Sequence, residues 1–173
     1  MWFIAGNIFS DSMTDSTEIP PVSVIIAIRN GEDALTRLLT DLASQDYSGE
    51  MEFILVDDES EDSTSTLIQN IAAKDKRFKY EVSVNGDPSL NYKKRALDSG
   101  IKNAQSEWLL FTDADCRLQS SWVRGMATYF TYDIDYVVGL SEVDSGNKWV
   151  TRFQSIDYLM LMICARGSTK AGQ

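Results

Sequence analysis

The chain has 173 residues, a formal net charge of −10 and no histidine. The acidic balance argues against electrostatic binding of nucleic acid or anionic lipid by the chain as a whole. The absence of histidine excludes serine–histidine and cysteine–histidine nucleophiles and removes the commonest transition-metal ligand, so any catalysis has to use carboxylates, lysines, hydroxyls or a metal ion.

Residues 1–21 form a leader that precedes the first predicted strand. Its apolar opening, MWFIAGNIF, is too short to span a bilayer and lacks the basic flank and small-residue cleavage site of a secretory signal. The leader is either an ordinary chain terminus or the end of a membrane-proximal segment. Residues 22–173 are long enough for one domain with a sizeable core.

Five apolar runs predict β-strands, and amphipathic segments separate them. The first run, VSVIIAI, is β-branched and almost continuously apolar, as strands buried on both faces are. The alternation of strand and helix predicts an α/β fold with a mostly parallel sheet of about five strands and helices on both faces, a three-layer sandwich. The strands are expected at residues 22–28, 52–56, 79–84, 107–112 and 136–140.

Apolar residues that recur at steps of three and four predict the connecting helices. The first helix follows Asn30, which is able to cap it, and is expected to end near Gln45. If the acidic stretch DDESEDST forms a turn, Asp62 or Ser63 is the expected cap of the second helix. The apolar stripes of the helices lie within residues 34–42, 67–72, 96–104 and 122–130.

Two pairs of aspartates follow predicted strands. Asp57 and Asp58 come directly after the second strand, and Asp113 and Asp115 follow the fourth. Ligands of open α/β sheets bind beyond the carboxyl ends of the strands, so these carboxylates are expected at one edge of the sheet. An all-oxygen site favours Mg²⁺ or Mn²⁺ over zinc, and such ions usually complete their shell with water and substrate phosphates. The pattern therefore favours a divalent ion and a phosphate-bearing ligand.

Other interpretations of the aspartates stay open. Aspartates after strands also form turns and cap helices. ILVDDES resembles the first strand and acidic pair of a response-regulator receiver domain, a signalling module that binds Mg²⁺. In a receiver, however, the pair follows the first strand and a lysine follows the fifth, and neither holds in this sequence. A noncatalytic nucleotide-binding domain is the remaining alternative.

Longer stretches of the chain resemble the family-2 glycosyltransferases. The resemblance rests on PVSVIIAIRNGEDALTRLLTDLASQDY, ILVDDESEDST, KKRALDSGIKNAQSEWLLFTDADC and FQSIDYL, and it runs from Pro21 to the C-terminus. It implies the Rossmann-like GT-A fold and an enzyme of the hexosyltransferase type, which transfers a sugar from a nucleotide diphosphate to an acceptor with inversion. The nucleotide-sugar-binding domain would then occupy residues 22–173.

The resemblance also implies roles for individual residues. Ala27, Arg29 and Asp58 correspond to positions that contact the nucleotide base and ribose. Asp113 and Asp115 form the D-x-D motif that binds Mn²⁺ or Mg²⁺, and the ion bridges to the diphosphate of the donor. These assignments make Asp113 part of both the nucleotide site and the metal site.

Some positions depart from the family pattern. Lys93 corresponds to a lysine that suits a phosphate, but the glycine that precedes this lysine in the family is Tyr92 here. The family often has proline where this chain has Ala27 or Ile28. Lys93 could equally be a solvated lysine in a basic cluster, and Arg29 a plain loop residue.

No catalytic residue is assigned within the chain. The family places its carboxylate base well downstream of D-x-D, and Glu142 and Asp144 are the acidic candidates between the fifth strand and the final helix. Neither is chosen, so the base is expected downstream of Gln173. The chain is then expected to be the donor-binding part of a longer enzyme, truncated at its C-terminus and inactive alone.

The expected partners follow from the same resemblance. A UDP-sugar is the expected donor, and the acceptor is a glycan or a lipid. Residues 149–165 are predicted to be helical, and their apolar run YLMLMICA is too short to span a membrane but suited to a core or to a homodimer contact. We expect the full-length protein in the cytoplasm or at the cytoplasmic face of the cell membrane.

Overall fold

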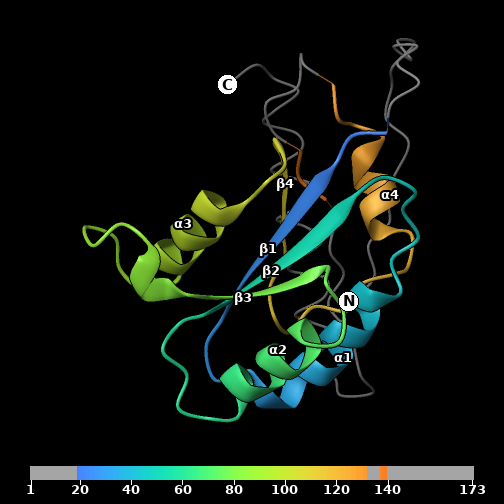
Figure 1. The fold of residues 1–173 in the computed structure, drawn as a ribbon. Helices are drawn as coiled ribbons and strands as arrows, with labels where there is room; N and C mark the ends of the chain where they lie inside the picture. Colours follow the sequence, from blue (N-terminus) through green and yellow to red (C-terminus); the bar gives the residue numbers. More distant parts are fainter. Residues whose placement is uncertain (1–18, 132–136, 140–173) are drawn as a thin grey trace, which may run out of the picture.

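The computed structural model describes residues 19–131 and 137–139. Within these residues the core is an all-parallel sheet of four strands in the order β3-β2-β1-β4 (Figure 1). The described residues hold four strands where about five were expected: residues 137–139 of the expected fifth strand carry no strand structure, and its residues 136 and 140 lie outside the described part of the chain. The predicted helix at 149–165 lies outside the described residues. The strands are β1 (Val22–Ile28), β2 (Met51–Asp57), β3 (Phe78–Val82) and β4 (Trp108–Phe111).

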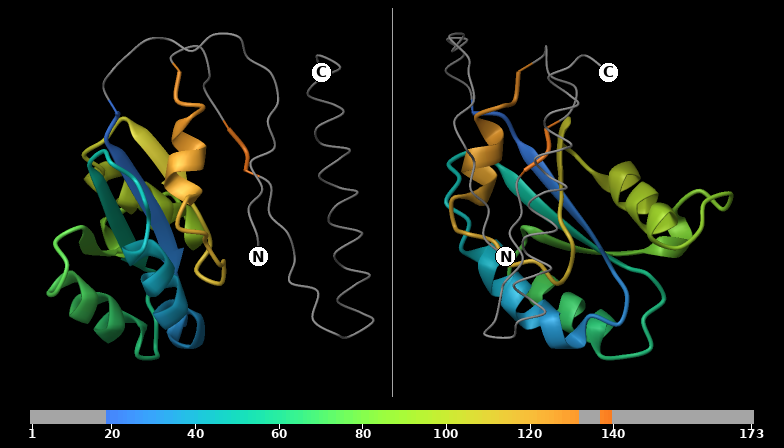
Figure 2. Two further views of the ribbon diagram at one scale, coloured as in Figure 1. Left: turned by 90° about the vertical axis from the view of Figure 1, so that its right-hand side faces the viewer. Right: turned by 180° about the vertical axis from the view of Figure 1, so that it is seen from behind.

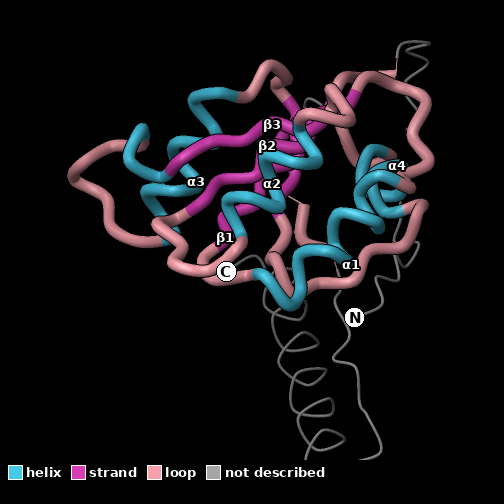
Figure 3. Tube along the Cα trace, turned by 60° about the horizontal axis from the view of Figure 1, so that its bottom comes forward, coloured by secondary structure: helices cyan, strands magenta, loops and turns pink. Residues whose placement is uncertain are grey.

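Helices cover both faces of the sheet, which confirms the predicted three-layer α/β arrangement. Figures 2 and 3 show α1 and α2 on one face and α3 on the other. Parallel crossovers are right-handed, so a helix changes face when the chain reverses its direction across the sheet. The chain steps from β1 to β3 in one direction, and α3 then returns it past β1 to β4. The helices are α1 (Glu32–Ala43), α2 (Thr64–Ala72), α3 (Lys93–Asn103) and α4 (Trp122–Ala127), with a short 3₁₀ helix at Ser83–Asn85. Among the described residues, none of these helices has the length and apolar character that a membrane crossing needs.

The central strand β1 divides its side chains between two cores. Successive residues of a strand point to opposite faces, so Val24 and Ile26 enter the larger core with α1 and α2 while Ile25 enters the smaller core with α3. All three are fully buried, and each contributes about 1.5–3 kcal/mol relative to an exposed position. Burial on both faces explains why the strand is apolar at nearly every position.

A glycine in the interior of α3 faces β1 and β2 at close contact. A Cβ at Gly100 would stand 2.4 Å from Cγ2 of Ile25 and 3.1 Å from Cγ2 of Val56. Ser99 Oγ also donates a hydrogen bond of 2.9 Å to the carbonyl of Val82, which ties the helix to the end of β3. The glycine weakens the isolated helix, but it permits this close packing.

The expected cap of α1 is wrong by one residue. The N-cap is Gly31, because Asn30 adopts a left-handed backbone with φ 50°. Asn30 instead uses its side chain to accept a hydrogen bond of 2.8 Å from the N–H of Glu61, in the loop before α2. The Asn30 side chain thus bonds to a residue distant in sequence, and not to the helix that it directly precedes.

The first turns of α1 and α2 cap each other. Thr64 Oγ1 accepts the Gly31 N–H at 2.8 Å, and the Asp62 carboxylate accepts both the Glu32 N–H at 3.1 Å and the Thr64 N–H at 3.0 Å. Ser63 is the N-cap of α2, as expected, but its side chain makes no capping bond. The unpaired N–H groups of two helix starts are therefore satisfied by one shared network.

A buried carboxylate holds the strands together at the amino end of the sheet. Glu52 accepts hydrogen bonds from Ser23 Oγ and from the Gln105 N–H at 2.7 Å, and it pairs with the Lys79 ammonium. Burial raises the pKa of Glu52, but the bonds from Lys79, Ser23 and Gln105 outweigh it and hold the pKa below its usual value. The ionised form of Glu52 therefore stabilises the fold.

Glu52→Gln is expected to lower the free energy of unfolding at neutral pH by about 1–3 kcal/mol, because the amide cannot accept all these bonds. The folded pKa lies below the unfolded value of about 4.3, so the carboxylate's contribution is complete above that pH and is lost as the pH falls through the folded pKa. The deficit of the variant should therefore shrink in acid. Urea unfolding from neutral pH to about pH 3 measures this. Glu50→Gln, at an exposed side chain, is the control, and a deficit that stays constant with pH would contradict the prediction.

The residue directly before helix α3 has a strained backbone. Tyr92, directly before the helix, has φ 53° and ψ −139°, a backbone conformation that glycine adopts freely and other residues avoid. Its carbonyl accepts the Arg95 N–H at 2.9 Å and starts the helix, while its side chain is 75% exposed. The fold thus requires a backbone conformation at this position that a residue with a Cβ atom disfavours.

Tyr92→Gly is expected to raise the free energy of unfolding by about 1 kcal/mol, because relief of the strain exceeds the extra flexibility of the unfolded chain. Tyr92→Ala keeps a Cβ atom and should give no such gain. Urea midpoints at unchanged denaturant slope compare the two variants. An equal effect of glycine and alanine would show that the ring, and not the backbone, sets the stability of this position.

Candidate functional site

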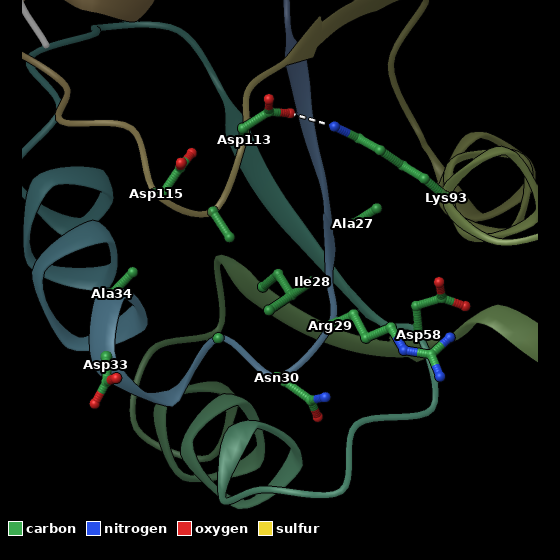
Figure 4. Close-up of a pocket in the computed structure, with 12 residues that line it drawn as sticks. Ala27, Ile28, Arg29, Asn30, Asp33, Ala34, Asp58, Lys93, Asp113 and Asp115 are labelled. Atoms are coloured by element: carbon green, nitrogen blue, oxygen red, sulfur yellow. Dashed lines mark hydrogen bonds and ion pairs between the residues drawn. The ribbon is translucent and has the colours of Figure 1, made fainter. Parts of the chain in front are cut away.

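A pocket of about 400 Å³ opens at the carboxyl end of the sheet (Figure 4). It lies where the strand order reverses, between β1 and β4, which is the ordinary ligand position in open α/β sheets. Its volume suits a ligand of moderate size. All the site residues predicted from the sequence line it, namely Ala27, Arg29, Asp58, Lys93, Asp113 and Asp115.

The loop after β1 and the first turn of α1 form one wall of the pocket. Sequence reasoning identified Ala27 and Arg29 here but missed Asn30, Gly31 and Asp33, which also line the pocket, together with Ile28, Ala34 and Ala114. The rule that pointed to the aspartates after β2 and β4 applies equally to residues after β1. That rule would have found these residues as well.

Asp58 and Asp57 have different roles although they are neighbours. Asp58 is 4% exposed, its N–H donates to the Ile28 carbonyl at 2.8 Å, and its Oδ1 is buried with no hydrogen bond from the described residues. Asp57 does not line the pocket, and its Oδ1 accepts the Ser60 N–H at 3.1 Å. A buried carboxylate oxygen without a donor is costly, so a ligand that donates to Asp58 would stabilise the site.

Asp113 and Asp115 lie in the loop after β4, on the other side of the pocket from Asp58 (Figure 4). The loop turns back on itself where the Cys116 N–H donates to the Asp113 carbonyl at 3.2 Å. Both carboxylates are exposed, and Lys93 reaches from the start of α3 to form an ion pair with Asp113. The pocket thus places a cationic side chain beside the D-x-D motif.

The two acidic pairs do not gather around one point. No group of three or more His, Cys, Asp or Glu side chains within residues 19–131 and 137–139 is arranged to hold a metal ion. A protein-only cage for a cation is therefore not formed by this part of the chain. Two exposed carboxylates beside an open pocket do fit Mg²⁺ or Mn²⁺, because these hard ions complete their shells with water and with phosphate oxygens of a ligand.

Comparison with known proteins identifies relatives of this chain. An uncharacterized glycosyltransferase of Haemophilus influenzae is 29% identical over 83% of this chain and 58% of its own length. A GalNAc(5)-diNAcBac-PP-undecaprenol beta-1,3-glucosyltransferase of Campylobacter jejuni is 31% identical over 59% of this chain and 32% of its own. The chain therefore spans less than two thirds of the length of these relatives.

A solved structure and a family model also match this chain. The mannosyltransferase of Pyrobaculum calidifontis in complex with GDP-Man and Mn²⁺ matches with a TM-score of 0.51 and 26% identity, over 62% of this chain and 31% of that one. Its likeness identifies the described sheet and helices as a GT-A fold. The model of the family named Glycosyl transferase family 2 matches residues 23–169, which is most of the chain. The chain belongs to glycosyl transferase family 2.

Proposed function

We propose that this chain binds the donor of a sugar transfer, a nucleotide diphosphate sugar held together with Mn²⁺ or Mg²⁺. The observation that carries the proposal is the pocket between β1 and β4, which has Asp58 on one side and the D-x-D pair with Lys93 on the other. The Pyrobaculum relative, which binds GDP-Man and Mn²⁺, supports this ligand class. A UDP-sugar is our first choice of donor.

The nucleoside would bind on the Asp58 side of the pocket. The unpaired Oδ1 of Asp58 can accept from an N–H of the base or a hydroxyl of the ribose, and such a bond would compensate for the burial of the carboxylate. Ala27 has a small side chain and leaves space beside it, and the exposed Arg29 supplies donors at the rim. This half of the site recognises the nucleoside without help from a metal.

The diphosphate would bind on the D-x-D side. Four carboxylates and two cationic side chains line the pocket, so a diphosphate meets repulsion unless a cation accompanies it. Asp113 and Asp115 would hold that cation, and Lys93 would contact a phosphate oxygen. When bound, the ion neutralises charge on the leaving diphosphate.

We propose that an acceptor hydroxyl of a glycan or a lipid attacks the sugar from the face opposite the diphosphate, with inversion, and that a carboxylate base removes its proton. The glucosyltransferase of Campylobacter jejuni carries an undecaprenol-linked glycan in its name. A lipid-linked acceptor would place the full-length protein at the cytoplasmic face of the membrane, and a soluble acceptor would place it in the cytoplasm.

Nucleoside diphosphate binding is expected to depend on a divalent ion. Calorimetry with UDP and GDP, in Mn²⁺ and in EDTA, should give an affinity about tenfold or more higher with the ion. Asp115→Asn should abolish this gain without lowering the affinity in EDTA, where the loss of one carboxylate relieves repulsion of the diphosphate. Asp58→Asn should weaken binding by about tenfold in both conditions, because it changes a charged hydrogen bond to the nucleoside.

Asp33→Asn is the matched control for both variants. Asp33 lines the same pocket from the first turn of α1, and the substitution changes the charge equally. It should retain the dependence on Mn²⁺. Equal affinities in Mn²⁺ and in EDTA for the wild-type chain would refute metal-dependent donor binding, whereas a preference for GDP would change only the base.

Lys93→Met is expected to have opposite effects on two ligands. The ion pair with Asp113 competes with a metal ion for that carboxylate, so its loss should raise the affinity for Mn²⁺ alone. Both side chains are more than half exposed, and the gain should be modest, at most about fivefold. The affinity for UDP with Mn²⁺ should fall, because Lys93 no longer contacts the phosphate. Calorimetry measures both, and two changes of the same sign would contradict the assigned role.

A further inference from the structure

The last turn of α1 and the residues that follow this helix bind the chain segment that follows the D-x-D motif. Asp41, buried in the last turn of α1, accepts hydrogen bonds from Arg117 Nε at 2.7 Å, from Arg117 Nη2 at 3.1 Å and from the Leu118 N–H at 3.1 Å. Burial raises the pKa of Asp41, but the bonds from Arg117 and Leu118 outweigh it and lower the pKa. A buried, ionised carboxylate therefore grips both the side chain and the backbone of this segment.

The residues after α1 extend the same grip. Gln45 is buried, donates to the Gln119 carbonyl at 2.8 Å and accepts the Val123 N–H at 3.0 Å. The Asp46 N–H donates to the Ser120 carbonyl at 2.7 Å. Residues 117–123 are thus attached to α1 and its C-terminal end by side chains and backbone alike.

These contacts leave only a short loop that carries Asp113 and Asp115. Phe111 is fixed by pairing with Ile25 in the sheet, and Arg117 is fixed by Asp41, so residues 112–116 connect two anchored points. Between these two points the Cys116 N–H donates to the Asp113 carbonyl, which holds the loop in a turn. Cys116 is also buried in the core. The place of Asp115 in the pocket therefore depends on where Asp41 holds Arg117.

We propose that Asp41 is a positioning residue for the metal site, an inference that rests on the proposed function. It acts in two ways. It fixes the end of the loop that carries Asp115, and it engages the Arg117 guanidinium, which is half exposed and lies only two residues from Asp115. A free guanidinium so near would compete with the metal ion for the carboxylate, as the Lys93 ammonium does at Asp113.

The test separates the metal-dependent part of nucleotide binding from the rest. For Asp41→Asn, calorimetry should show about a tenfold loss of UDP affinity in Mn²⁺, the size typical when a residue that supports a metal ligand is replaced. Its UDP affinity in EDTA, which depends on the Asp58 side, should stay unchanged. A purely structural defect would instead weaken binding in both conditions, and that outcome overturns the proposal.

Asp75→Asn is the matched control. Asp75 likewise binds an arginine and a backbone N–H, both of Arg77, in the turn just before β3, and the substitution removes the same charge. It should leave UDP binding unchanged in both conditions. Equal losses in Asp41→Asn and Asp75→Asn would overturn the proposal.

Arg117→Gln covers the case in which Asp41→Asn does not fold, as judged by urea unfolding. The substitution removes the ion pair while Asp41 still accepts the Leu118 N–H. It should weaken UDP binding in Mn²⁺ but not in EDTA, and the loss should be smaller than in Asp41→Asn. Unchanged binding in Arg117→Gln would overturn the proposal. If the wild-type chain shows no gain from Mn²⁺, the proposed function itself fails, which is a separate result.

Discussion

The reversal of strand order at β1 determines where a ligand can bind. Because β2 and β4 lie on opposite sides of β1, the loop after β1 lies between the loops after its neighbours, and residues of all three loops line the pocket. After the reversal α3 packs on the face opposite α1 and α2, and Gly100 permits its close contact with Ile25 there. The start of the same helix carries Lys93, which lines the pocket.

The strands and the pocket could be predicted because both follow from local pattern. A run such as 22–28, apolar on both faces, has few alternatives to a central strand, and it matches β1 residue for residue. Once the sheet is parallel, every residue after a strand comes to the same edge, so Asp58, Asp113 and Asp115 can be placed without knowing any contact. The family resemblance supplied Lys93 and Arg29, which the pattern alone could not.

The remainder depends on contacts between residues distant in sequence. Asparagine is a common helix cap, yet the Asn30 side chain accepts a hydrogen bond from the Glu61 N–H. Asp57 differs from Asp58 because the Ser60 N–H donates to the Asp57 carboxylate. The bonds from Arg117 and Leu118 to Asp41 join residues far apart in the chain, and no short motif signals them. Polar contacts of this kind are set by the finished fold, so hydrophobic periodicity carries no information about them.

The shared capping of α1 and α2 has a consequence for motion at the pocket. The loop between β1 and α1 and the loop between β2 and α2 hold each other, since the Gly31 N–H donates to Thr64 and the Glu61 N–H donates to Asn30. Neither loop can move away without exposing the helix start of the other. Local opening of a protein proceeds in cooperative units, and these two loops belong to one such unit. The backbone beside Arg29 and the backbone beyond Asp58 therefore open and close together, and a molecule that holds either loop slows hydrogen exchange in both.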